Sequence, residues 1–233
     1  YFKLISVNFH VKNIDEMKII EKFRVSNLSK SFVEAASSFC ISFPQFSFRL
    51  IHILEEKADQ TITTDEPNNA LLLIYKFVNI PLFPFSKYWT PIFESLKNDK
   101  FSIEVKKLQV LALLSIIKNE TQQDEQHQKL IDLIYIVQAC QNEVYLTFLR
   151  NIDNDLLPLF MEDSLRIISL SISINQYTPY SDIVRLFIRL QKLNPLSVFN
   201  IFIQLLNLLP TTYSQFTSYS NKKKLLKVWN LIL

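Results

Sequence analysis

The chain has 233 residues, of which 48% are hydrophobic and 20% charged, and its formal net charge is +3 at pH 7. This composition excludes an intrinsically disordered chain, and so small a charge does not require a nucleic-acid or membrane partner. Glycine is completely absent. Because glycine supplies the positive φ angles of tight hairpins and phosphate-binding loops, its absence argues against multi-stranded β folds, dinucleotide-binding turns and P-loops. Helices joined by short polar turns need glycine least, since asparagine can replace it where a helix ends.

The first predicted element is the segment 1–12, in which every second residue from Ile5 to Val11 is apolar. This period of two is typical of a half-buried strand, and the run also fits the cut end of a helix, so both alternatives stay open. The chain begins at Tyr1 without the pattern of a signal peptide, and we interpret it as a piece of a longer protein.

Residues 13–210 are predicted to form one helical-repeat domain, in which capping residues and prolines delimit the helices. In chain order, helices are expected from residue 13, at 27–40, 42–57 and 67–78, from residue 86, and at 102–118, 129–139, 142–150, 162–174, 183–193 and 196–209. A polar linker at 211–221 and a terminal helix at 222–233 follow.

Several of these boundaries depend on single residues. Ser42 and Ser102 are predicted to cap the helices that follow them, and Pro91 is expected to divide a short helix in two. The polar stretches 58–64 and 120–128 are predicted to be loops.

The helix predicted at 102–118 is apolar on almost all sides, which is typical of a helix that lies between neighbours inside a stack. The most apolar stretch of the chain, 70–85, is interrupted by Lys76, Asn79 and two prolines, so no helix is expected to cross a membrane.

Four segments share one pattern, a compact and almost wholly apolar helix after a polar cap. They are NNALLLIYKFVN from Asn68, KKLQVLALLSIIK from Lys106, DSLRIISLSISIN from Asp163 and SVFNIFIQLLNL from Ser197. Their starts are 38, 57 and 34 residues apart. Two of these intervals are close to a repeat length of about 40 residues, and a divergent or inserted unit would fill the third.

Within these segments, VKKLQVLALLSIIKN and EDSLRIISLSISINQ resemble the buried helices of armadillo and HEAT repeats. The resemblance extends over about 67–210 and points to no particular member of that superfamily. It implies an all-α fold, an armadillo/HEAT-like right-handed superhelical array of stacked helices that serves as a scaffold. The alternative is a compact helical bundle. In a repeat array each helix contacts only its neighbours in the sequence, which distinguishes the two.

The residue types that often bind metals or carry catalysis are scattered. His10, His52 and His127 have no carboxylate or cysteine at the spacing of a metal site, and Cys40 and Cys140 have no CxxC partner. Both cysteines are predicted to be buried thiols in a reducing, intracellular setting.

Neighbouring acidic residues occur in four places, which we interpret as helix ends or solvated loops rather than acid–base pairs. These are Glu55-Glu56, Asp124-Glu125, Asp153 with Asp155, and Glu162-Asp163. A nucleophile elbow cannot form without glycine. The sequence therefore predicts a protein that is not an enzyme and that uses no cofactor, metal or small-molecule substrate.

Two basic groups are candidate partner-binding sites. Arg185, Arg189 and Lys192 recur on one face of the helix 183–193, opposite its apolar residues. This stripe fits either a solvated outer face or a groove that binds an acidic peptide or a phosphate.

The second group is Lys222, Lys223 and Lys224, which follow a linker that contains tyrosine and phenylalanine. Basic residues beside aromatic ones can bind single-stranded nucleic acid through phosphate contacts and stacking. Lysines on a terminal helix also serve simple solvation, so both interpretations stay open.

We expect a non-enzymatic scaffold that holds other protein subunits in a larger eukaryotic assembly, nuclear rather than cytoplasmic. The aromatic content of 13%, with 19 phenylalanines, fits a surface that partners partly cover. The alternatives are a nucleic-acid-binding helical repeat and a transport or trafficking adaptor, which use the same architecture.

Overall fold

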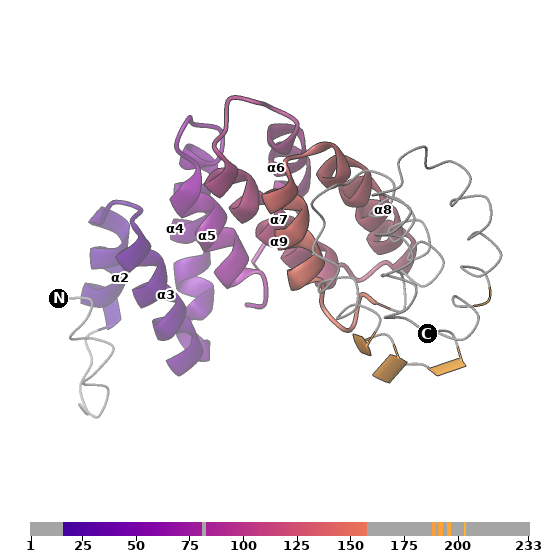
Figure 1. Ribbon diagram of the computed structural model, residues 1–233. Helices are drawn as coiled ribbons and strands as arrows, with labels where there is room; N and C mark the ends of the chain where they lie inside the picture. The colour runs from indigo at the N-terminus through magenta and orange to yellow at the C-terminus, as the bar shows by residue number, and fades with distance from the viewer. Residues whose placement is uncertain are drawn as a thin grey trace. The chain divides into compact units, whose positions relative to one another are not determined.

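The computed structural model describes residues 16–80 and 83–157, together with positions 188, 189, 191, 192, 195, 196 and 203. The two long stretches form eight α-helices, labelled α2 to α9, and one short 3-10 helix, η1, and they contain no strand (Figure 1). The all-α prediction is confirmed for this part of the chain. In the same part, every helix is too short or too polar to span a lipid bilayer.

The chain divides into two compact units, Tyr1–Thr121 (unit 1) and Gln122–Leu233 (unit 2). This division falls inside the helical domain predicted at 13–210. The predicted boundaries at 12, 210 and 221 lie outside the described residues and stay predictions. The same holds for the segment 1–12 and for the helices predicted at 162–174 and 222–233. Within the predicted helices 183–193 and 196–209, the described positions are helical.

The described part of unit 1 contains six α-helices that alternate between two layers. The first layer consists of α2 (Glu16–Val25), α4 (Pro44–Thr61) and α6 (Trp89–Leu96), and η1 (Phe85–Tyr88) leads into α6. The second layer consists of α3 (Lys30–Ser42), α5 (Asn68–Phe77) and α7 (Ile103–Lys118).

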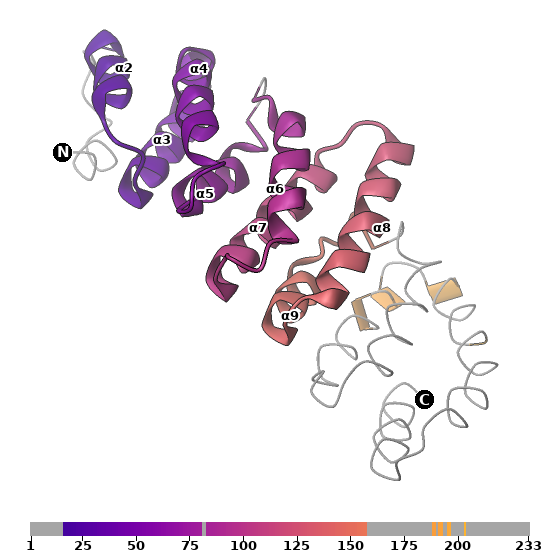
Figure 2. The same ribbon diagram turned by 90° about the horizontal axis from the view of Figure 1, so that it is seen from above.

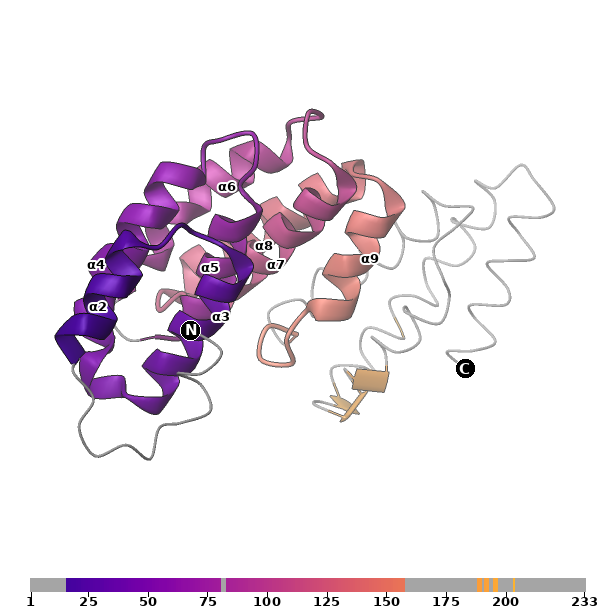
Figure 3. The same cartoon turned by 90° about the vertical axis from the view of Figure 1, so that its left-hand side faces the viewer.

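Close packing in unit 1 joins helices that are adjacent or next but one in the chain. α2 packs on α4, α3 on α4 and α5, α4 on α5, α5 on α7, and α6 on α7. Figure 2 shows α2, α4 and α6 on one side of the unit and α3, α5 and α7 on the other. In Figure 3, α2 lies beside α4 and α3 lies beside α5. We call α2–α3, α4–α5 and α6–α7 hairpins, because the two helices of each follow one another in the chain and lie in different layers; α4 packs on α5, and α6 packs on α7.

The central helix α7 forms as the sequence predicts. Ser102 caps it, and its hydroxyl oxygen accepts a hydrogen bond from the Val105 backbone N–H at 3.4 Å. Leu113 is fully buried, and so is Gln109, whose Nε2 donates to Ser95 Oγ of α6 at 2.7 Å. The burial of residues on almost every side places α7 inside the stack, against both α5 and α6.

The predicted cap at Ser42 is wrong. Ser42 is the last residue of α3, and α4 begins at Pro44 after Phe43, without a side-chain cap. The serine that does cap in this region is Ser29, whose hydroxyl accepts a hydrogen bond from the Phe32 backbone N–H at 3.2 Å. Pro44 has no backbone N–H. Its lack does not weaken α4, because the N–H groups in the first turn of a helix have no partner within the helix.

The loop predicted at 58–64 is also largely wrong, because α4 continues to Thr61. Leu54, Ala58 and Ile62 lie four residues apart and are all buried, so the apolar stripe extends beyond the point where the sequence turns polar. The polar residues between them occupy the solvent side of the same helix.

Two further boundaries differ from the prediction. Pro91 lies in the first turn of α6, where it is tolerated, and the division between η1 and α6 falls before Trp89. In unit 2, α8 (Gln123–Ala139) begins six residues before the predicted start at 129, and its first turn is polar and exposed.

The described helix ends need no glycine. Each C-cap residue described from α3 to α9 has a negative φ, from −135° at Phe43 to −55° at Val78. Asn119 follows α7, as an asparagine is expected to do, yet its φ of −95° is not left-handed. Since no such cap requires a positive φ, the absence of glycine has no cost at these positions.

The described part of unit 2 begins with α8, which packs on α9 (Asn142–Asn151). Their contact faces are apolar and include Leu133 and Val137 of α8 and Val144 and Phe148 of α9, all of which are fully buried. The turn after α9 adds buried Ile152. α8 and α9 thus form a fourth hairpin of the same kind.

Candidate functional site

The structure describes two members of the predicted basic stripe, Arg189 and Lys192, and gives them different surroundings. Arg189 is half-buried, its Nε donates to Asn154 Oδ1 at 3.0 Å, and its Nη2 donates to the carbonyl oxygen of Ile152. Lys192 is exposed. Arg185 lies outside the described residues.

Arg189 contacts the C-terminal end of α9. Ile152 is the C-cap of α9, and a cation is favourable where the carbonyl groups of a helix end point outward. Burial lowers the pKa of Arg189, and the nearby carboxylate of Asp153 opposes this effect. An arginine remains charged under such conditions, so Arg189 holds the turn after α9 as a cation.

The candidate cluster Lys222, Lys223 and Lys224 lies outside the described residues, and it stays a prediction. His10 is likewise not described. His52 is exposed on α4, and His127 is half-buried on α8. Within the described ranges, no group of three or more histidine, cysteine, aspartate or glutamate side chains could hold a metal ion.

The two cysteines differ in burial. Cys40 is buried in α3, as predicted, and burial raises the pKa of its thiol to about 12. Cys140 is only half-buried after α8, so its predicted full burial is wrong. A thiol with a raised pKa is a poor nucleophile, because the thiolate is the reactive form.

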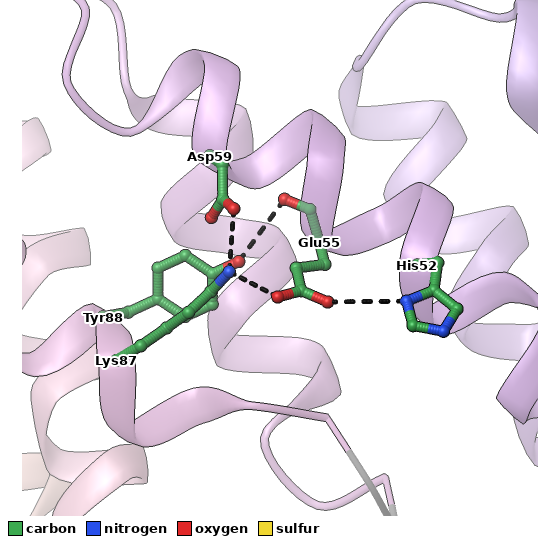
Figure 4. A network of polar contacts seen from close by, with 5 residues as sticks. All are labelled: His52, Glu55, Asp59, Lys87 and Tyr88. Atoms are coloured by element: carbon green, nitrogen blue, oxygen red, sulfur yellow. Dashed lines mark hydrogen bonds and ion pairs between the residues drawn. The ribbon is translucent and has the colours of Figure 1, made fainter.

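A cluster of charged side chains that sequence reasoning missed joins α4 to η1. Lys87 Nζ lies 2.6 Å from Glu55 Oε1 and 2.7 Å from Asp59 Oδ2 (Figure 4). Tyr88 Oη donates to the backbone oxygen of Glu55 at 3.4 Å, and His52 Nδ1 lies 3.8 Å from Glu55 Oε2. We call these five residues the Lys87 cluster.

The electrostatics of the Lys87 cluster favour a structural contact over acid–base chemistry. Burial acts to lower the pKa of Lys87, but hydrogen bonds to Asp59 and Glu55 and their negative charges outweigh burial and raise it. Burial, followed by the same carboxylates, raises the pKa of Tyr88 far above its ordinary value. A general acid or base needs a pKa near the working pH, whereas both groups are shifted away from neutrality.

The sequence could not place these residues together, since 28 to 33 positions separate Lys87 and Tyr88 from their partners on α4. Glu55 was interpreted as a helix-end residue and Asp59 as part of a loop, and both lie within α4. The usable signal was their spacing of four, which places two carboxylates on one helical face.

Several large apolar side chains of the described residues are exposed. Ile41, at the end of α3, is 74% exposed, and Phe48, in the first turns of α4, is 51% exposed. Pro44 between them is exposed as well. We call these three residues the α3–α4 corner. The side chain of Arg49 lies over the Phe48 ring, with Cζ 5.6 Å from the ring centroid.

A second partly open surface lies on α6. The rings of Trp89 and Phe93 are stacked with centroids 5.1 Å apart, and Lys97 Nζ lies 4.7 Å from the Phe93 centroid. Trp89 and Phe93 are half-buried, so this stack covers part of α6 rather than projecting from it.

Comparison of the chain with protein-family models, with curated proteins and with solved structures gave no match. The functional argument therefore depends on the arrangement of the helices and on the side chains at their surfaces.

Proposed function

We propose that this chain is a non-enzymatic scaffold, an armadillo/HEAT-like array of helical hairpins that binds other protein subunits within a larger nuclear assembly. One observation carries the proposal, the regular recurrence of the hairpins. The second helices of successive hairpins, α3, α5, α7 and α9, begin at residues 30, 68, 103 and 142, so their starts are 38, 35 and 39 residues apart. This spacing is close to the repeat length of about 40 residues in such arrays.

The recurrence explains the irregular interval in the sequence pattern. The segments that begin at 106 and 163 are 57 residues apart, and the α8–α9 hairpin lies between these positions. The helix predicted at 142–150 corresponds to α9, and it lay outside the pattern of wholly apolar helices because its outer side is polar.

The packing in unit 1 favours a repeat array over a compact bundle. Helices pack on the helix before or after them, or on the next one in the same layer. In a repeat array each unit contacts only its neighbours, and the resulting extended surfaces bind partners. We propose in addition that the hairpins of this chain are arranged in a right-handed superhelix, as in armadillo and HEAT proteins.

The α3–α4 corner is the surface that we propose for partner binding. Aromatic residues are enriched in the central part of protein–protein interfaces, and Phe48 is such a residue. Phe48 and the exposed Ile41 lie at a turn between two hairpins, where a partner has access without separating the layers.

The test compares two charge substitutions at exposed apolar residues. Ile41→Asp combined with Phe48→Asp changes the α3–α4 corner, and Val25→Asp, at a residue that is 71% exposed in α2, is the matched control. We expect the corner variant to lose the partner proteins that co-purify with the wild type, while the control retains them. Equal recovery of partners by both variants, with unchanged circular dichroism, would exclude the corner as the binding surface.

Nucleic-acid binding is a second candidate, favoured by the exposure of Lys192. Because Arg189 holds the turn after α9, charge reversal there would perturb the fold, and Lys192→Glu is the cleaner variant. If phosphates bind here, the affinity for single-stranded DNA falls with increasing salt, and Lys192→Glu reduces the slope of that dependence by about one. An affinity that does not change with salt contradicts this function.

A further inference from the structure

The second and third hairpins of unit 1 meet differently in the two layers. In the second layer α5 and α7 pack closely, and both helices have fully buried side chains, among them Leu73, Ile74 and Leu113. In the first layer, α4 and α6 show no comparably close packing. The Lys87 cluster bridges the first layer, because η1 brings Lys87 and Tyr88 against α4.

The bridge has a charged part that remains accessible to water. Glu55 and Asp59 stand one turn apart on α4, and the Lys87 ammonium lies between them at 2.6 and 2.7 Å (Figure 4). The side chains of Lys87, Glu55 and Asp59 are 36%, 28% and 49% exposed. Dissolved ions therefore reach all three and weaken their attraction.

The bridge also has a buried part that fixes the position of Lys87. Tyr88 is 2% exposed, and its ring stacks on Phe83 at a centroid distance of 5.9 Å and 21° between planes. Lys87 Nζ lies 5.0 Å from the Tyr88 ring centroid. Tyr88 is held in the core, and its neighbour Lys87 reaches the two carboxylates of α4 from the same short helix.

We infer that the Lys87 cluster is an electrostatic latch that closes the first layer between the second and third hairpins, and that the apolar α5–α7 contact is the hinge about which this layer opens. Without the Lys87 ammonium, the closed arrangement holds Glu55 and Asp59 partly out of water with no cation between them, whereas the open arrangement returns both carboxylates to water. The hinge persists because apolar packing does not depend on the ion pairs. This inference does not depend on the scaffold function.

The experiment measures two distances between spin labels in the full chain. One pair of labels, at Glu56 and Thr90, spans the first layer, and the other, at Lys76 and Lys118, spans the second, with Cys140→Ser in the background. The variant is Lys87→Met. The matched control is Lys97→Met, since Lys97 also pairs with a glutamate at 2.6 Å and lies over an aromatic ring, but both partners belong to the adjoining helix α6.

Lys87→Met is expected to shift the first-layer distances toward a longer, broader distribution, with a change of up to about fivefold in the ratio of open to closed molecules. The second-layer distances stay unchanged, and Lys97→Met changes neither pair. Raising the salt concentration of the wild type gives the same shift without any substitution. First-layer distances that respond to neither Lys87→Met nor salt, or second-layer distances that broaden equally, overturn the inference.

Discussion

The two layers of unit 1 differ in the polar contacts that join distant parts of the chain. In the first layer these contacts use mainly lysine ammonium groups, at Lys57 and Lys87, together with the Tyr88 hydroxyl. In the second they use neutral amides, with Asn69 Nδ2 donating to the Leu28 carbonyl at 3.1 Å and Asn119 Nδ2 to Asn79 Oδ1 at 3.0 Å. The comparison indicates that apolar packing and neutral hydrogen bonds hold the helices of the second layer together. In the first layer, contacts of charged lysine groups contribute more to holding the helices.

The largest expected effect is in the second layer. Leu113→Ala should lower the free energy of unfolding by about 2–5 kcal/mol, because it leaves a cavity in a site with no exposed surface. Leu108→Ala is the matched control on the same helix, where the side chain is half-buried, and its cost should be clearly smaller. Urea-induced unfolding measures both. Equal costs would contradict the picture of a tightly packed second layer.

A smaller effect is expected at Lys57, which lies in the first layer. Its ammonium donates to the carbonyl oxygens of Arg24 and Ser26, at 3.1 and 2.6 Å, and so binds the end of α2. Lys57→Met should cost about 1–2 kcal/mol and speed amide exchange in α2.

The control is Lys76→Met, at an exposed lysine of α5. It should leave exchange in α2 unchanged. If α2 exchanges at the wild-type rate in Lys57→Met as well, the lysine contact does not hold the first layer at this end.

Alanine substitutions at two serines near helix ends, Ser102 and Ser42, should differ by about 1 kcal/mol in their effect on the free energy of unfolding. Ser102→Ala removes the hydroxyl that accepts the Val105 N–H and should destabilise α7 by about that amount. Ser42→Ala should be almost neutral, because Ser42 ends α3 and caps nothing. Thermal unfolding of the two variants distinguishes them, and a larger loss from Ser42→Ala would mean that the α3–α4 junction differs from the one described.

The smallest effect at neutral pH is expected from the ionisation of Cys40. Its thiol has an ordinary pKa of 9.0, and burial raises the pKa to about 12 in the folded protein. Below pH 9 the thiol is neutral in both states, so its contribution to stability is constant. Between pH 9 and about 12 only the unfolded chain ionises, which lowers stability as pH rises.

Urea unfolding of the wild type and Cys40→Ala checks this expectation. The difference between their free energies of unfolding should be constant from pH 6 to 8 and should change in favour of Cys40→Ala above pH 9. A difference that stays constant up to pH 10.5 would show that water reaches the thiol and that the second layer is not dry at α3.

The sequence predicted α7 well because a cap, a long apolar pattern and a polar end agree there. It predicted the C-terminal end of α4 and the start of α8 poorly for one physical reason. Polar residues on the solvent side of a helix resemble loop residues, and only burial of Ala58 and Ile62 shows that the helix continues. The Lys87 cluster could not be predicted from the sequence, because only tertiary packing brings η1 to α4. The basic stripe was found as a pattern, but the bond from Arg189 to the end of α9 depends on tertiary contacts too.

The buried pair of Gln109 and Ser95 has a consequence for how the chain avoids misfolding. The second-layer helices of this chain have similar apolar faces, so α6 could in principle pair with the wrong one during folding. Gln109 Nε2 finds the Ser95 hydroxyl only when α6 lies against α7. A pairing that covers Gln109 with another helix leaves its Nε2 without a partner, as its buried Oε1 already is, at a cost of about 1–3 kcal/mol. This one hydrogen bond therefore favours the pairing of α6 with α7 over pairings of similar hydrophobicity.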